Sequence, residues 1–273
     1  MLAVWIHEPT PFLWQWNEHW GIRYYGLAYV LGFLILYAGL RVFYRWGWTP
    51  LKPADRGDFL TWIILGTLAG GRLGYCLLYD LPRTLSDPIG VVAFWREGGI
   101  SGMASHGAFV GIILAIFLFA RSRGIPFWCL ADDAATLAPA GLGLGRVANF
   151  LNGELWGRTT EVPWAVVFQA TGGGPEPRHA SQLYEAAGEG LFLFVLLCWF
   201  RSRHPRPGRA ALLFFSGYAV VRIVCEHFRE PDVQIGYLAL GLTQGQWLSV
   251  GFLLASVVFW RLLPREKKKT QGV

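Results

Sequence analysis

The stretch Ile22–Leu40, read as IRYYGLAYVLGFLILYAGL, decides the fold class, because it is almost entirely apolar over the length that crosses a bilayer. After Arg23 it carries no charged residue before Arg41. Six further segments have the same character: Phe59–Tyr79, Ala104–Ala120, Cys129–Leu151, Leu183–Phe200, Ala210–Phe228 and Trp247–Leu263. The sequence therefore predicts an all-α membrane protein with seven transmembrane helices, forming one integral membrane domain over residues 1–273.

Composition supports the same class. Apolar residues make up 53% of the chain and charged residues 15%, against roughly 25% charged residues in soluble domains. The net charge of +6 comes from short loops and from the tail Arg265–Lys269. No basic stripe with interleaved aromatic residues follows a helix, so we expect no nucleic-acid partner. The tail suits anionic lipid headgroups.

The positive charges also orient the predicted helices. Fifteen Lys and Arg residues lie on one set of flanks and six on the other, while Arg72, Arg146 and Arg222 lie inside predicted spans. The richer side is cytoplasmic by the positive-inside rule. This predicts an N-terminus outside, a C-terminus in the cytoplasm, and two long outer loops at about 80–103 and 152–182.

Polar residues inside the predicted spans carry the functional signal, because a charge in hydrocarbon costs at least about 2.5 kcal/mol. In the predicted orientation they gather in the outer leaflet: Tyr25, Arg72, His106, Arg146, Asn149, Gln182, Glu185, Arg222 and Glu226. Tyr218, Arg222 and Glu226 are four residues apart and share one helix face. Several arginines at one level suit a phosphate, with the carboxylates holding them when the site is empty. The alternative is that these charges only join helices to one another.

Other reactive residues point to no cofactor. The cysteines, Cys76, Cys129, Cys198 and Cys225, form no CxxC pair, so we expect small apolar residues in a helix bundle. The His and carboxylate spacings match no zinc motif, so no metal is expected. Asp132 and Asp133 open the fourth span and are predicted to cap that helix. We assign no specific role to His7, His19 or His204, and predict no cleavable signal peptide.

Four segments carry a specific pattern, and a fifth is weaker. They are Ile22–Leu27 (IRYYGL), Gly145–Arg158 (GRVANFLNGELWGR), Arg178–Ala186 (RHASQLYEA), Arg222–Asp232 (RIVCEHFREPD) and, less specific, Gln244–Ser249 (QGQWLS). Together they resemble the bacterial prolipoprotein diacylglyceryl transferases over about residues 22–249. Two features depart from that family. Gly98-Gly99 precedes His106-Gly107-Ala108 by six residues instead of three, and Ala180 stands where the family has proline.

The resemblance implies an activity. The family moves a diacylglyceryl group from phosphatidylglycerol to the lipobox cysteine of a preprolipoprotein that keeps its signal peptide, and releases glycerol 1-phosphate. The resemblance also implies an enzyme of the bacterial plasma membrane, surrounded by membrane lipids, with its active site towards the outer leaflet. A thiol of pKa about 8.5 must lose a proton before it attacks.

By resemblance, Arg146 and Arg222 bind the headgroup phosphate, and His106 is the candidate base or orienting group. Tyr25, Asn149, Glu154 and Glu226 position the headgroup and the arginines. Glu154 and His179 are further candidates for taking the proton. Tyr218 and Gln182 complete the predicted set of substrate-binding residues.

Two other classes compete with this interpretation. Gly99–Gly102 reads GISG, a pattern of intramembrane serine proteases of the rhomboid type, but four residues with one free position are a weak signal. A protease would also leave Arg146 and Arg222 without a role. A transporter for an anionic solute predicts polar residues through the full depth of the bilayer. The inner halves, such as Leu191–Trp199 and Phe252–Trp260, are nearly all apolar.

Overall fold

The computed structural model describes residues 5–17, 21–91, 102–204, 206–231 and 236–263. Two compact units emerge from its contacts, one formed by Met1–Gly32 with Ala135–Val273 and the other by Phe33–Ala134. Helices α1 (Tyr24–Arg45) and α5 (Phe127–Asn152) each run from one unit into the other. Several predicted features lie outside the described residues: the basic tail, His19, and Gly98–Ser101.

All seven predicted spans are helical. They correspond to α1, α2, α4, α5, the run α6–η5–α7, α8 and α9. The bounds not yet given are α2 (Arg56–Leu78), α4 (Ser105–Arg123), α6 (Ser181–Glu185), η5 (Ala186–Phe192), α7 (Leu193–Arg203), α8 (Arg209–Cys225) and α9 (Gln244–Leu262). Short helices are η1 (Pro53–Asp55), α3 (Leu81–Ser86), η2 (Pro88–Val91), η4 (Gln169–Thr171) and η6 (Ala239–Gly241).

Five helical segments are long and apolar enough to cross a membrane, within the described ranges: Tyr24–Arg45, Pro53–Leu78, Ser105–Arg123, Ser181–Arg203 and Gln244–Leu262. Only 11% to 28% of their most apolar windows is buried by protein, so lipid is the natural cover for the rest. α5 and α8 are not among the five. α8 has 17 residues because the chain turns after Cys225, where Phe228 N–H donates to the Cys225 carbonyl at 3.0 Å.

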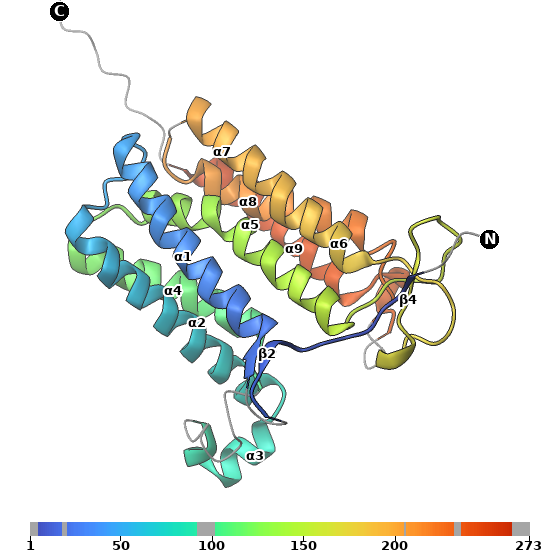
Figure 1. Ribbon diagram of the computed structural model, residues 1–273. Coiled ribbons are helices and arrows are strands. Elements are labelled where there is room, and N and C mark those ends of the chain that lie inside the picture. Colours follow the sequence, from blue (N-terminus) through green and yellow to red (C-terminus); the bar gives the residue numbers. More distant parts are fainter. Residues whose placement is uncertain (1–4, 18–20, 92–101, 205, 232–235, 264–273) are drawn as a thin grey trace, which may run out of the picture. The chain divides into compact units, whose positions relative to one another are not determined.

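The helices of the larger unit lie side by side, with α7 packed on α8 and α8 on α9 (Figure 1). The π-helix η5 interrupts the run from α6 to α7. Here Gly190 and Gly143 of α5 meet backbone to backbone, since a Cβ at Gly190 would lie 2.6 Å from the Gly143 Cα. This close crossing brings the carboxylates around η5 up to the polar side of α5.

The loop after α5 (residues 152–180) forms a folded cap with one short strand, and the N-terminal segment carries three more. The sequence predicted none of these strands. Strand β4 (Val166–Val167) pairs in parallel with β1 (Trp5–Ile6), and β2 (Phe12–Gln15) pairs with β3 (Gly21–Arg23). A hydrophobic cluster of Phe150, Val166, Phe168 and Ala180 fixes the loop on the end of α5. Ala180 keeps a φ of −76°, close to the value that proline would impose at this position.

His7 of the N-terminal segment is buried against this cap, although its sequence position indicated no specific role. Its side chain is 4% exposed and packs against Phe150 and Phe168, with ring centroids 5.0 and 5.2 Å away. Burial lowers the pKa of the His7 imidazole, and a hydrogen bond with the Phe150 backbone opposes this shift.

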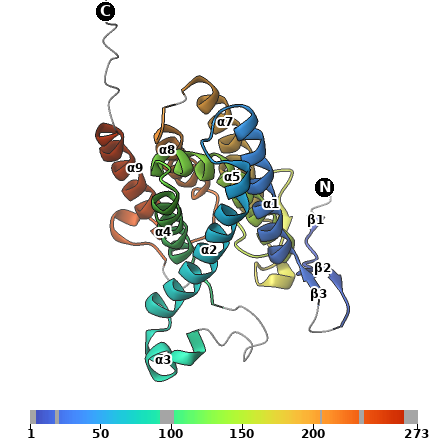
Figure 2. The ribbon, with the colours of Figure 1, turned by 90° about the vertical axis from the view of Figure 1, so that its left-hand side faces the viewer.

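In the second unit, α2 and α4 lie side by side and α3 lies beyond the end of α2 (Figure 2). The two helices approach through Gly70 and Gly107, where a methyl group at Gly70 would overlap the Gly107 carbonyl oxygen. Arg72 donates to the carbonyls of Gly90 and Val91 at 2.8 and 3.0 Å. It therefore holds the segment after α3 against α2, beside a cavity of about 220 Å³.

The prediction that Asp132 and Asp133 cap the fourth span is wrong. α5 begins at Phe127, so both residues lie in its second turn. Asp133 is fully buried and accepts a hydrogen bond from the Thr49 hydroxyl. This buried hydrogen bond links Thr49, in the segment before η1, to Asp133 of α5. In the part of the chain that the structure describes, no cysteine forms a disulfide, and Cys76 and Cys225 are buried.

Candidate active site

Two arginines from different helices share buried carboxylates in the larger unit. Arg146 of α5 pairs through Nη1 with Glu185 Oε2 at 3.0 Å, and Arg222 of α8 pairs through Nη1 with Glu185 Oε1 at 2.8 Å. The Glu185 side chain is 1% exposed. The structure thus joins the two arginines that the sequence singled out.

Glu189, one turn further along, makes a second bridge. Its Oε2 lies 3.1 Å from Arg146 Nε and its Oε1 lies 3.6 Å from Arg222 Nη1. The side chain is fully buried. Glu185 is the last residue of α6 and Glu189 lies in the π-helix η5, whose hydrogen-bonded turn is one residue longer than in an α-helix. Both carboxylates contact the same two guanidinium groups.

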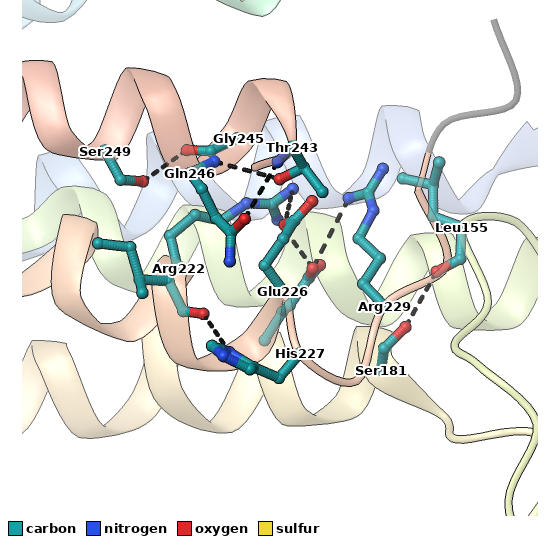
Figure 3. Close-up of polar contacts among 12 residues, drawn as sticks. Leu155, Ser181, Arg222, Glu226, His227, Arg229, Thr243, Gly245, Gln246 and Ser249 are labelled. Carbon is teal, nitrogen blue, oxygen red and sulfur yellow. Dashed lines mark hydrogen bonds and ion pairs between the residues drawn. The ribbon is translucent and has the colours of Figure 1, made fainter. Parts of the chain in front are cut away.

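Glu226 completes the environment of Arg222. It lies four residues later at the end of α8, and its Oε2 is 3.0 Å from Arg222 Nη2 (Figure 3). Two of the three residues predicted to share one face of this helix, Arg222 and Glu226, therefore form an ion pair. Tyr218, one turn before Arg222, packs its ring beside Phe214 at a centroid distance of 6.1 Å.

A third arginine joins the cluster without having been predicted there. Arg229 is 6% exposed, and its Nη1 lies 3.6 Å from Glu185 Oε1. The sequence interpretation counted it among the outer flanking charges. Arg229 lies in the Arg222–Asp232 motif, three residues after Glu226, and this position was the sequence feature that could have identified it as a site residue.

Tyr25, Asn149 and Glu154 form a second polar group. The Tyr25 hydroxyl donates to Glu154 Oε2 at 3.1 Å and accepts a hydrogen bond from the Asn149 amide. Asn152 donates to the other Glu154 oxygen at 3.0 Å. Asn149 follows Arg146 by three residues, so both lie on one face of α5. Three of the predicted positioning residues are thus in contact, and Glu154 is exposed.

The turn that presents Glu154 is strained and held from behind. Leu155 has a backbone φ of +57°, a value that residues other than glycine rarely adopt. Gln182 donates to the Glu154 carbonyl at 2.6 Å and Ser181 to the Leu155 carbonyl at 3.1 Å. Gln182 is fully buried, so its observed contact is with this turn, and its predicted contact with substrate stays a prediction.

The two histidines proposed as proton acceptors lie in different units. His106 is in the first turn of α4, in the second unit, and is half-buried. His179 lies in the cap, with Nδ1 3.1 Å from the Tyr184 hydroxyl. Burial lowers the pKa of the His179 imidazole, which favours its neutral, proton-accepting form. The role of His106 stays a prediction.

The arginine cluster can recognise an oxyanion. In the described residues, the positive charges of Arg146, Arg222 and Arg229 are matched by Glu185, Glu189 and Glu226. Arg146 and Arg222 keep 17% and 11% of their side chains exposed, while Glu185 and Glu189 are almost fully enclosed. The arginines thus keep part of their side chains accessible while buried carboxylates hold them in place, an arrangement that suits a phosphate.

Comparisons with known proteins agree with this chemistry. The family model described as "Prolipoprotein diacylglyceryl transferase" matches residues 11–262. A protein of Rhizobium meliloti (strain 1021) is 48% identical over 243 residues, covering 86% of this chain and 83% of its own. A protein of Rhodospirillum rubrum is 47% identical over 90% of this chain and 89% of its own, and one of Bordetella avium is 44% identical over 91% and 92%. Each is named "Phosphatidylglycerol--prolipoprotein diacylglyceryl transferase".

Proposed function

The chain belongs to the prolipoprotein diacylglyceryl transferase family of bacterial membrane transferases, and from this premise we propose its reaction and site. The enzyme moves the sn-1,2-diacylglyceryl group of phosphatidylglycerol to the lipobox cysteine thiol of a preprolipoprotein. A thioether forms and glycerol 1-phosphate leaves. Family membership leaves the protease and transporter interpretations without support.

The observation that carries the proposal is the pair of arginines on one buried carboxylate. Glu185 touches Arg146 and Arg222 within 3.0 Å, so the two guanidinium groups are held close together before any ligand arrives. Such preorganised donors stabilise charge that develops on a leaving phosphate without a reorganisation cost. Phosphatidylglycerol supplies that group through its headgroup.

The chemistry follows from the charges. The cysteine sulfur attacks the glyceryl carbon that bears the phosphate ester, and the carbon–oxygen bond breaks as the carbon–sulfur bond forms. The bonding electrons leave on the phosphate oxygen, next to Arg146 and Arg222. The thiol proton must pass to a base. His106, Glu154 and His179 are the candidates, and the exposed carboxylate of Glu154, held by Tyr25 and Asn152, is open to the outside of the bundle.

The same proposal gives the enzyme a topology and location. Seven helices span the plasma membrane, with the N-terminus outside, the C-terminus in the cytoplasm and the arginine cluster towards the outer leaflet. Membrane lipids surround the bundle, and the signal peptide approaches from the outer side. The cap formed by residues 152–180 borders the site through Glu154, which makes it the natural surface for docking that peptide.

A transfer assay tests the function. Purified enzyme in detergent is mixed with phosphatidylglycerol and a lipobox peptide, and mass spectrometry follows the peptide. We expect the mass of one diacylglyceryl group to appear on the cysteine peptide and not on a peptide with serine in its place. Modification of both peptides, or of neither, would contradict the proposal.

A further inference from the structure

Gly245, in the first turn of α9, lies against the Arg222–Glu226 pair (Figure 3). A Cβ atom at this position would lie 3.1 Å from Arg222 Nε, 3.3 Å from Arg222 Nη2 and 3.2 Å from Glu226 Oε2. These separations are shorter than ordinary van der Waals contact. Any side chain at position 245 would therefore press on the guanidinium group proposed to bind the phosphate.

Arg222 has little room to retreat from such a side chain. Its Nη1 is held by Glu185 at 2.8 Å and its Nη2 by Glu226 at 3.0 Å. Both carboxylates are buried, with side-chain exposures of 1% and 5%. A shift of the guanidinium lengthens ion pairs that are shielded from water, and breaking buried pairs is costly. The edge of the guanidinium that faces Gly245 carries Nε together with Nη2, the nitrogen that also pairs with Glu226.

The backbone of Gly245 is fixed by the start of its own helix. Thr243 is the N-cap residue, and its hydroxyl accepts from Gln246 N–H at 3.3 Å while the Gln246 side chain accepts from Thr243 N–H at 3.0 Å. This is a capping box, and Thr243 is 4% exposed. Ser249 donates to the Gly245 carbonyl at 2.7 Å. These bonds fix the conformation of the first turn of α9, so the backbone at Gly245 cannot change its shape without losing them.

We propose that Gly245 is a positioning residue of the transfer reaction. The capping box fixes the backbone at this glycine, and the missing side chain leaves the edge of the Arg222 guanidinium that carries Nε and Nη2 without a Cβ contact, so that a phosphate oxygen can approach it. The inference rests on the proposed function and extends the site to α9. A glycine needed only for helix packing would change the stability of the protein and not its affinity for the phospholipid.

The test compares Gly245→Ala with Gly251→Ala in the full-length enzyme. Gly251 lies on the same helix, and a Cβ there meets nothing within 4 Å. We expect the KM for phosphatidylglycerol in Gly245→Ala to rise about fivefold or more, because small misplacements in a site are expensive. Gly251→Ala should match wild type in KM and in melting temperature. Gly245→Ala should also melt lower than wild type, because the displaced guanidinium lengthens buried ion pairs, but the rise in its KM is the result that decides the inference.

A KM for Gly245→Ala within twofold of an active wild type overturns the inference. An inactive wild type overturns the proposed function instead, so the two failures are distinct. A second pair of variants tests the capping box itself. Thr243→Ala removes the hydroxyl and should raise the KM in the same direction, whereas Thr243→Ser keeps the hydroxyl and should restore it. Equal KM values for the two Thr243 variants would refute the role of the cap.

Discussion

At the scale of single residues, the site depends on Arg146 and Arg222, which each pair with more than one glutamate at once. Arg222 uses separate nitrogens for Glu185 and Glu226, at 2.8 and 3.0 Å, while Arg146 uses Nη1 and Nε for Glu185 and Glu189. A planar fork can make such contacts in two directions at once. The positions of Arg146 and Arg222 were predictable from their cost in a membrane. The position of Arg229 was not predictable in this way, because Arg229 lies outside the predicted span, where a charge carries no energetic cost that would mark it as functional.

Replacing Arg222 by lysine should therefore fail although the charge is kept. A lysine ammonium is a point charge and cannot reach Glu185 and Glu226 in the same geometry. We expect kcat/KM for phosphatidylglycerol to fall by about 100-fold, the scale of losing one preorganised donor. The matched control is Arg203→Lys, at an exposed position at the end of α7. Wild-type kinetics in Arg222→Lys would contradict the claim that the site needs a guanidinium group paired with both Glu185 and Glu226.

At the scale of elements, close helix crossings position the reactive side chains. All seven predicted spans are helical, and length and hydropathy identify five helical segments able to cross a membrane in the described residues. The π-helix η5 was not predictable, since its seven residues read as ordinary helix and only the crossing at Gly143 and Gly190 shows why a longer turn fits. The misassigned Asp133 has the same origin. An acidic residue near a helix start looks like a cap until its tertiary partner, Thr49, is known.

The α2–α4 crossing makes a prediction about stability. A methyl group at Gly70 would overlap the Gly107 carbonyl and lie 2.8 Å from the Gly111 Cα. We expect Gly70→Ala to destabilise the protein by about 1–3 kcal/mol, the usual cost of overpacking. Gly57→Ala on the same helix is the control, because nothing lies within 4 Å of its added methyl group. Thermal unfolding in detergent distinguishes them, and equal melting temperatures would contradict the observed packing.

The cap makes a prediction about pH. Burial lowers the pKa of His7 in the folded protein below its unfolded value of about 6.5. The unfolded chain therefore binds the proton more readily, and stability falls as the pH drops below about 6.5. In His7→Phe this part of the pH dependence should disappear. Melting temperatures measured at pH 7.5 and 5.0 test it, and an equal drop in wild type and variant would show that His7 does not contribute.

At the scale of the whole molecule, the protein is a membrane enzyme, and the charges of its candidate site meet inside one of its two units. Five segments qualify as membrane-spanning by length and hydropathy in the described chain. α5 and α8 carry Arg146 and Arg222, the arginines of the site, and α8 is also short. The functional residues lower the apolar signal of their own helices, so the seven-helix topology needs direct evidence.

Labelling of single cysteines provides that evidence. In a variant lacking the four natural cysteines, Trp164→Cys lies in the cap and Arg203→Cys at the end of α7, and both positions are exposed. A membrane-impermeant maleimide should label Trp164→Cys in spheroplasts and Arg203→Cys only after lysis. The reverse pattern would invert the topology, and labelling of both in spheroplasts would exclude a membrane between the two positions.

The decisive experiment for the proposed phosphate site measures release of glycerol phosphate from phosphatidylglycerol by wild type, Arg146→Ala and Ser101→Ala enzymes with a lipobox peptide. Ser101 lies outside the described residues and represents the protease interpretation. The account predicts release that requires the peptide cysteine, persists in Ser101→Ala and is lost in Arg146→Ala. Undiminished release by Arg146→Ala, or peptide cleavage that depends on Ser101, would contradict it.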